Sequence, residues 1–312
     1  MRRTIFAFLA FFFVAGGVAQ ATEPASCQKV RFSDVGWTDI TSTTATASLI
    51  LEALGYQPET QVLSIPVTYS GMKNKDIDVY LGDWQPSMEA DRKPYLDDKS
   101  IEVVGTNLTG AKYTFAVPKY VADAGVKDFA DLQKFADKFD HKIYGIEPGN
   151  NGNRMIQDMI DKDAFGLKGW DLVESSEQGM LTEVERAVRN KSWIVFLGWA
   201  PHPMNTRFDM VYLAGGDDYF GPNYGGAEVL TDIRAGYGKE CPNVTKFVSN
   251  LKFTLDMENQ MMGAILDDGK APKAAATEWL KAHPDVVKPW LNGVTTFDGG
   301  DAEAAVKSLI AQ

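Results

Sequence analysis

The pattern of apolar and polar positions alternates between strand-like and helix-like segments along the chain. Short apolar runs are typical of strands, and longer stretches with apolar residues every three or four positions are typical of helices. Gly55 is expected to end the first helix, because it suits the left-handed position that follows a helix. The expected strands are 30–32, 62–67, 77–81, 103–104, 113–117, 142–146 and 193–197, and the expected helices are 41–54, 129–138 and 154–162. This order predicts an α/β fold with parallel-sheet character.

One short phrase occurs twice in this pattern. Residues 79–88 read VYLGDWQPSM and residues 195–204 read VFLGWAPHPM. Each is a strand-like run that ends in Gly and is followed by a Trp, one further residue and a Pro. Ligands bind at the carboxyl ends of strands in open α/β sheets. We therefore expect Trp84 and Trp199 to present aromatic faces to a cleft between two similar lobes, the alternative being that both are core residues.

The amino terminus predicts export. Arg2 and Arg3 precede the uncharged run 5–18, and residues 19–21 read AQA, the small-x-small form of a signal-peptidase site. We expect cleavage after Ala21 and ordinary secretion, although the arginine pair also invites a twin-arginine interpretation. No later run reaches the length that spans a bilayer.

The chain has two cysteines, Cys27 and Cys241. Export into an oxidising compartment, an even count and a wide separation favour one disulfide between them. Acylation of Cys27 as a lipoprotein anchor is the alternative, but the residues before it lack the aliphatic position that such a site requires.

Charge adds one weak hint. The formal net charge is −11, and removal of residues 1–21 would take away two arginines and no acids. An acidic surface argues against nucleic acid and anionic membranes as partners and mildly favours cationic solutes, although solubility alone explains it as well.

The chain length suits two lobes with real cores. We expect lobe 1 to comprise residues 22–110 and 214–312, and lobe 2 to comprise residues 111–213. The expected disulfide then lies within lobe 1, so the lobes are free to open and close about two crossover strands.

Four aromatic residues fall at predicted strand ends, two in each lobe: Trp37, Trp84, Tyr113 and Trp199. A quaternary ammonium group has no N–H to donate, so a protein binds it with ring faces and a nearby negative charge. The aromatic positions therefore indicate a cage that closure of the lobes would assemble.

These residues carry a family resemblance that covers essentially the whole exported chain. It rests on VGWTD at 35–39, LGDWQPSM at 81–88, GAKYTFAVP at 110–118, EPGNNGN at 147–153 and FLGWAPHPM at 196–204. The chain resembles periplasmic substrate-binding proteins of ABC importers for quaternary amines, most closely the choline-binding ones of the glycine betaine/proline betaine superfamily. The resemblance implies a two-lobed, type II periplasmic-binding-protein fold. It also implies a choline site made of Trp37, Asp39, Trp84, Tyr113, Asn150 and Trp199.

Elementary chemistry favours choline within that family. Trp37 and Asp39 are two positions apart, so in an extended segment both side chains would face the ligand. Asn150 lies in a turn ahead of a helix, where a short amide can reach the cleft. The choline hydroxyl can donate to a carboxylate, whereas Asp39 would repel the carboxylate of a betaine. His202 is expected at the start of a helix and not at the ligand. Acetylcholine, glycine betaine, proline betaine and carnitine stay open as ligands, as does a sensor role.

The sequence gives little support to an enzyme. Its three histidines, His141, His202 and His283, have no metal-ligand spacing, and no nucleophile elbow or phosphate-binding loop is present. We expect no catalytic residue, metal or cofactor. The expected partners are the ligand and an ABC permease in the inner membrane, and the protein is expected to be a monomer in the periplasm.

Overall fold

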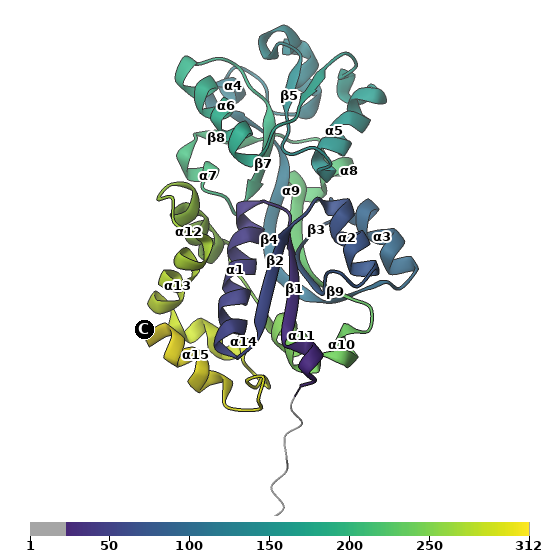
Figure 1. Ribbon diagram of the computed structural model, residues 1–312. Coiled ribbons are helices and arrows are strands. Elements are labelled where there is room, and N and C mark those ends of the chain that lie inside the picture. The colour runs from purple at the N-terminus through teal and green to yellow at the C-terminus, as the bar shows by residue number, and fades with distance from the viewer. Residues whose placement is uncertain (1–22, 312) are drawn as a thin grey trace, which may run out of the picture.

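In the computed structural model, residues 23–311 are described, and they form a mixed α/β architecture around one nine-stranded sheet (Figure 1). The expected cleavage site after Ala21 lies outside the described residues. The sheet order is β2-β1-β3-β9-β4-β7-β5-β6, with β8 paired to β4. The strands are β1 (Lys29–Asp34), β2 (Gln57–Val62), β3 (Val79–Gln85), β4 (Ile101–Pro118), β5 (Lys142–Tyr144), β6 (Asp171–Val173), β7 (Phe196–Ala200), β8 (Met210–Tyr212) and β9 (Gly226–Arg234).

Helices cover both parts of this sheet. They are α1 (Thr38–Ala53), α2 (Ile65–Lys73), α3 (Glu89–Asp97), α4 (Lys119–Asp123), α5 (Asn151–Asp161), α6 (Glu177–Asn190), α7 (Met204–Arg207), α8 (Asp217–Phe220), α9 (Pro222–Gly225), α10 (Tyr237–Glu240), α11 (Pro242–Asn250), α12 (Leu255–Leu266), α13 (Pro272–Ala282), α14 (Val287–Trp290) and α15 (Ala302–Ala311). Short 3-10 helices occupy Ala25–Cys27, Phe129–Phe139, Ala164–Gly166 and Pro284–Val286.

The molecule has two bodies joined by long strands (Figure 1). The lower body holds β1, β2 and β3 with α1 to α3 and the C-terminal helices, and the upper body holds β5, β7 and β8 with α4 to α7. Strand β4 pairs with β9 over its first part and with β7 and β8 over its last, so it carries the chain from one body to the other. The sheet is parallel within each body and antiparallel at β4 and β9. The lobe limits 22–110, 111–213 and 214–312 stay a prediction.

The first helix begins earlier than its apolar pattern suggests. Trp37 has the extended conformation of a residue that precedes a helix, and α1 starts at Thr38 instead of residue 41. The first turn of α1 is largely polar, so a search for apolar periodicity does not detect it. The helix ends as expected, because Gly55 adopts a φ of +90° directly after it.

Four other expected elements differ from the structure. The expected strand 62–67 is wrong: β2 ends at Val62, and Pro66 lies in the first turn of α2, where its fixed φ and missing N–H are tolerated. The expected short strands 103–104 and 113–117 are one continuous strand, β4. The expected helix 129–138 is a 3-10 segment with a kink at Phe135.

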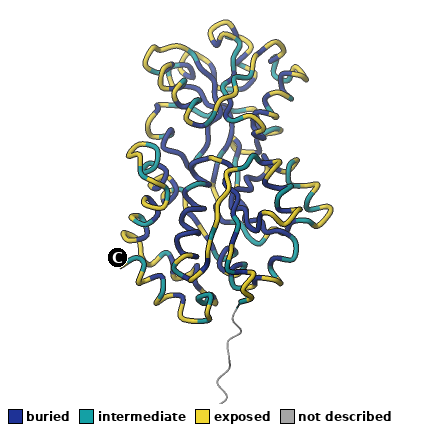
Figure 2. The backbone as a smooth tube through the Cα atoms, in the orientation of Figure 1, coloured by how far each residue is buried: buried dark blue, intermediate teal, exposed yellow. Residues whose placement is uncertain are grey.

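The predicted disulfide between Cys27 and Cys241 is confirmed. Its sulfur atoms are 2.00 Å apart, and both cysteines are buried. The bridge joins the segment ahead of β1 to the start of α11, both in the lower body. Figure 2 shows buried backbone at the junction of the two bodies and along central strands such as β3, whereas β2 and the outer loops are exposed. Among residues 23–311, no helix is long and apolar enough to cross a membrane.

Candidate functional site

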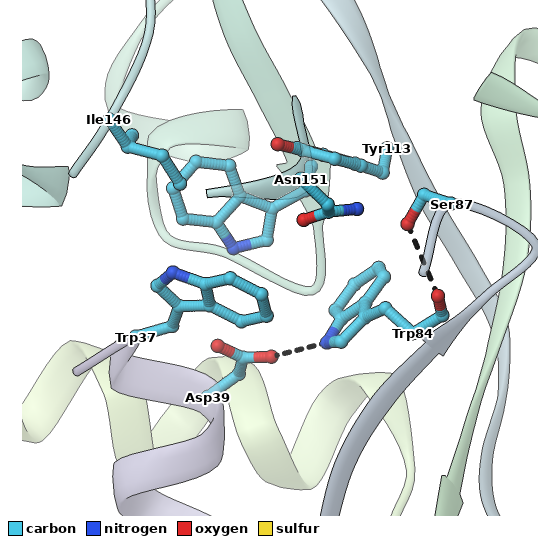
Figure 3. A pocket seen from close by; sticks show the side chains of 8 residues that line it. Trp37, Asp39, Trp84, Ser87, Tyr113, Ile146 and Asn151 are labelled. Carbon is cyan, nitrogen blue, oxygen red and sulfur yellow. Dashed lines mark hydrogen bonds between the residues drawn. The ribbon is translucent and has the colours of Figure 1, made fainter. Parts of the chain in front are cut away.

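A cavity lies where the two bodies meet, lined by residues near the ends of β3 and β7 and by Tyr113 within β4 (Figure 3). About 280 Å³ of space there is not filled by atoms, counting the part that is open to solvent. The lining residues are Trp37, Asp39, Trp84, Ser87, Tyr113, Ile146, Asn151 and Trp199. Five of the six residues expected from the sequence therefore line one cavity, and Asn150 does not.

Strand pairing brings three of the aromatic rings together. Tyr113 in β4 lies opposite Trp199 in β7, and their ring centroids are 6.4 Å apart at 76°. The rings of Trp84 and Tyr113 are 6.2 Å apart at 62°. Trp37 closes the cavity from the start of α1. Each of these four side chains is at most 7% exposed, so their faces are directed inward and not toward solvent.

Gly152 allows one of these rings to reach its place. A Cβ atom at this position would lie 1.9 Å from the Tyr113 hydroxyl. The close approach of the α5 backbone to the ring therefore requires glycine here.

Asp39 is the acidic residue of the cavity lining. Its Oδ2 accepts a hydrogen bond from Trp84 Nε1 at 3.0 Å, and its buried Oδ1 has no hydrogen-bond partner among the residues that the structure describes. Burial raises the pKa of Asp39 to about 8, with a smaller contribution from the Glu177 carboxylate, while the Trp84 hydrogen bond opposes the rise. The extended segment expected at 37–39 is wrong in part, because Asp39 lies in the first turn of α1 and only Trp37 is extended.

Two neighbouring asparagines have different roles at the start of α5. Asn150 caps the helix: its Oδ1 accepts from Gly152 N at 2.7 Å and from the Tyr113 hydroxyl at 3.1 Å. Its Nδ2 donates to Glu147 Oε1 at 2.9 Å. Asn151 instead lines the cavity, and both polar atoms of its buried side chain lack a hydrogen-bond partner within residues 23–311. An amide without partners costs free energy when buried, so this side chain is available to a ligand.

Sequence reasoning missed Asn151, Ser87 and Ile146. The signal for Asn151 was present in the Asn-Asn pair, but which amide faces the cavity depends on the backbone direction at the helix start. Ser87 donates to the Trp84 carbonyl at 3.2 Å and fills a place beside that ring. Ile146 is a buried apolar residue that follows β5.

The charge around the cavity has one sign. None of the eight lining residues is Lys, Arg or His. Glu147 accepts from Trp37 Nε1 at 2.9 Å, and burial raises its pKa. The cavity can therefore hold a cation against aromatic faces, and its lining has no basic side chain that would repel the cation. Within residues 23–311, no cluster of three or more His, Cys, Asp or Glu side chains could hold a metal ion.

Comparison with known proteins places this site in context. Residues 28–282 match the family model described as the substrate binding domain of an ABC-type glycine betaine transport system. An ABC-transporter choline-binding protein in complex with choline is 61% identical, with a TM-score of 0.91, over 92% of this chain and 100% of that one.

Two further solved structures are similar. An ABC-transporter choline-binding protein in an unliganded semi-closed conformation has the same 61% identity and the same coverage of 92% and 100%, with a TM-score of 0.85. Lactococcal OpuAC in its closed-liganded conformation, complexed with glycine betaine, is 29% identical over 84% of this chain and 98% of that chain, with a TM-score of 0.76. These neighbours confirm the predicted two-lobed, type II periplasmic-binding-protein fold.

Proposed function

The chain belongs to the family of substrate-binding domains of ABC-type glycine betaine transport systems, and from that premise we propose that it captures choline in the cavity between its two bodies. The family consists of substrate-binding proteins and not of enzymes, as the sequence predicts. One observation carries the choice of ligand: four aromatic faces surround a carboxylate oxygen without a partner, and no basic residue lines the cavity.

The trimethylammonium group would rest against the rings of Trp37, Trp84, Tyr113 and Trp199. Each ring face contributes about 0.5 to 2 kcal/mol, depending on how far the cation is desolvated. Asp39 would neutralise the cation through Oδ1. Asn151 would meet the hydroxyl, because its amide can both donate and accept.

Asn150 has a supporting part in this proposal. It fixes the Tyr113 hydroxyl and the start of α5, so it sets the position of Asn151 without lining the cavity itself. The proposed site therefore keeps the residues expected from the sequence and adds Asn151; the expected residues are Trp37, Asp39, Trp84, Tyr113, Asn150 and Trp199.

Glycine betaine is the second candidate. The raised pKa of Asp39 leaves the carboxyl protonated at neutral pH in the empty cavity, and a protonated carboxyl can donate to the carboxylate of a betaine. Choline requires the opposite state of Asp39. The two ligands therefore respond to pH in opposite directions.

Substrate-binding proteins of ABC importers act in the periplasm or outside the cell. For this chain we propose the periplasm, reached through a signal peptide at residues 1–21. The exported protein would work as a monomer that opens and closes about β4 and the crossover before β9. Its closed form would deliver choline to an ABC permease in the inner membrane.

Calorimetry on the exported chain tests the proposal. Choline, acetylcholine, glycine betaine, proline betaine and carnitine are titrated at pH 7 and 8.5, with arginine as a cation that lacks a quaternary nitrogen. We expect choline to bind most tightly at pH 8.5. Tighter binding of glycine betaine than of choline at both pH values would contradict the choice of ligand and leave the family assignment intact.

A further inference from the structure

The first turn of α1 carries Asp39 and follows Trp37, yet it has no cap from its own segment. Trp37 makes no capping hydrogen bond through its side chain. The open N–H of Thr38 is instead met by Glu177, whose Oε2 accepts from Thr38 N at 2.9 Å and from the Thr38 hydroxyl at 3.0 Å. Glu177 belongs to α6 in the upper body, so a carboxylate from one body caps a helix of the other.

The second oxygen of Glu177 reaches the opposite wall of the cavity. His202 Nδ1 accepts from Met204 N at 2.9 Å, so the proton is on Nε2, which donates to Glu177 Oε1 at 2.8 Å. The imidazole packs against the Trp199 ring at 4.8 Å between centroids. Thr38, Glu177 and His202, which we call the Glu177 link, are all buried, and none of them lines the cavity.

We propose that Glu177 is a positioning residue for ligand capture: it holds the two bodies closed by docking α6 onto the start of α1 and so fixes Trp37 and Asp39 against Trp199. This inference rests on the proposed function and deepens it, because it attributes part of the affinity for the ligand to a residue that does not contact the ligand.

Burial of the Glu177 carboxylate explains why the Glu177 link forms when the two bodies close. A carboxylate that is only 2% exposed must have its lone pairs satisfied, and here three donors and the positive end of a helix do so. When the bodies part, the Thr38 donors and Glu177 return to water. The two Thr38 bonds therefore exist only in the closed form, whereas the His202 bond lies within the upper body and can persist in both.

A second hydrogen bond also crosses the junction between the two bodies. Trp37 Nε1 donates to Glu147 Oε1 of the upper body at 2.9 Å, so the two successive residues Trp37 and Thr38 are both held across the junction by carboxylates. Glu147 also binds Asn150 beside the cavity. Glu177 is the better test residue, because its other hydrogen-bond partner within residues 23–311 is His202, which packs against the ring of Trp199.

Glu177→Gln tests the role with the shape preserved. The amide keeps one acceptor, but its NH₂ group opposes either the Thr38 N–H or the His202 N–H. We expect the dissociation constant for choline to rise about 10- to 100-fold, mainly through faster dissociation, since charge-assisted hydrogen bonds are lost from the closed form alone. The melting temperature of the ligand-free protein should stay near the wild-type value. Thr38→Ala should weaken binding less, because the backbone N–H remains, and should add little in the double variant.

Glu183→Gln is the matched control, because Glu183 lies on the same helix and its ion pair in the described part of the chain is with Arg186, three residues along. It should bind choline as the wild type does. If Glu177→Gln dissociates from choline at the wild-type rate, the inference is overturned while the proposed function stands. An equal loss of ligand-free stability and of affinity would also overturn it, because Glu177 would then act only in folding. If the wild type itself fails to bind choline, the function and the inference fall together.

Discussion

Asp39 and Trp84 form a hydrogen bond that occupies one carboxylate oxygen and leaves the other facing the cavity. Trp84 Nε1 donates to Oδ2 at 3.0 Å, and Oδ1 has no partner. Figure 3 shows the carboxylate between the rings of Trp37 and Trp84. The Trp84 indole therefore orients the Asp39 carboxyl group and also offers a ring face to a cation. This residue pair thus supplies both an acidic group and an aromatic face for binding a quaternary ammonium group.

Removing the charge at Asp39 should change the affinities for choline and glycine betaine by different amounts. Asp39→Asn keeps the shape and an acceptor for the Trp84 indole but removes the negative charge. We expect choline to bind about 10- to 150-fold more weakly, the equivalent of about 1.5 to 3 kcal/mol, because a charge-assisted contact is lost. Glycine betaine should lose less, because the neutral amide can replace the protonated carboxyl as a donor to its carboxylate.

Calorimetry with both ligands on the wild type and the variant measures this ratio. Asp140→Asn is the control, since Asp140 is exposed and its left-handed φ of 52° suits asparagine. Equal weakening of choline and glycine betaine by Asp39→Asn would show that Asp39 does not recognise the polar end of the ligand.

The raised pKa of Asp39 predicts proton release on choline binding. In the closed, empty cavity the pKa is about 8, so the carboxyl is protonated at pH 7. A bound cation favours the ionised form and lowers that pKa. Choline affinity should therefore rise with pH, by up to about tenfold per unit below pH 8, and level off above it. Glycine betaine affinity should fall over the same window.

Calorimetry at pH 7 in two buffers with different ionisation enthalpies counts the protons directly. Nearly one proton should leave per choline bound, and none should leave from Asp39→Asn. A choline affinity that is flat from pH 6 to 8.5 in the wild type would contradict this titration.

Much of the site was visible in the sequence because its residues recur in a repeated context. Trp84 and Trp199 each follow a Gly at the end of an apolar run, and the strands that carry them lie on the two sides of the junction. Tyr113 could be placed because it begins an apolar stretch that became the second half of β4. Local pattern was enough wherever a strand end positions the ring.

Other features depend on contacts between distant segments, and local pattern cannot supply them. Glu177 is one acid among several in an amphipathic helix, and only the folded chain brings it to Thr38. Asn151 could not be preferred over Asn150 without the backbone direction at the start of α5. Pro66 misled the strand prediction at 62–67, because an apolar run around a proline suits a helix start as well as a strand.

The disulfide should stabilise the fold without contributing to binding. Cys27 and Cys241 are 214 positions apart and lie away from the cavity. Closing so long a loop restricts the unfolded chain, so we expect the Cys27→Ala/Cys241→Ala double variant to lose about 2 to 5 kcal/mol of unfolding free energy. Urea titration measures the loss, and choline affinity at low temperature should be unchanged. Two free thiols in the native exported chain would contradict the bridge.

The two asparagines at the start of α5 can be told apart with a ligand that lacks the hydroxyl. Tetramethylammonium keeps the cation of choline and offers nothing to hydrogen-bond. If Asn151 meets the hydroxyl, Asn151→Ala should weaken choline about 5- to 10-fold, the value of about 1 to 1.5 kcal/mol for one neutral hydrogen bond, and leave tetramethylammonium unchanged. Asn150→Ala should weaken the binding of both ligands, because it frees the Tyr113 hydroxyl and uncaps α5.

Fluorescence titration of the two variants with choline and with tetramethylammonium, with the wild type as reference, gives the comparison. If Asn150→Ala selectively weakens choline while Asn151→Ala acts on both ligands alike, the roles are reversed, and Asn150 turns into the cavity when choline binds.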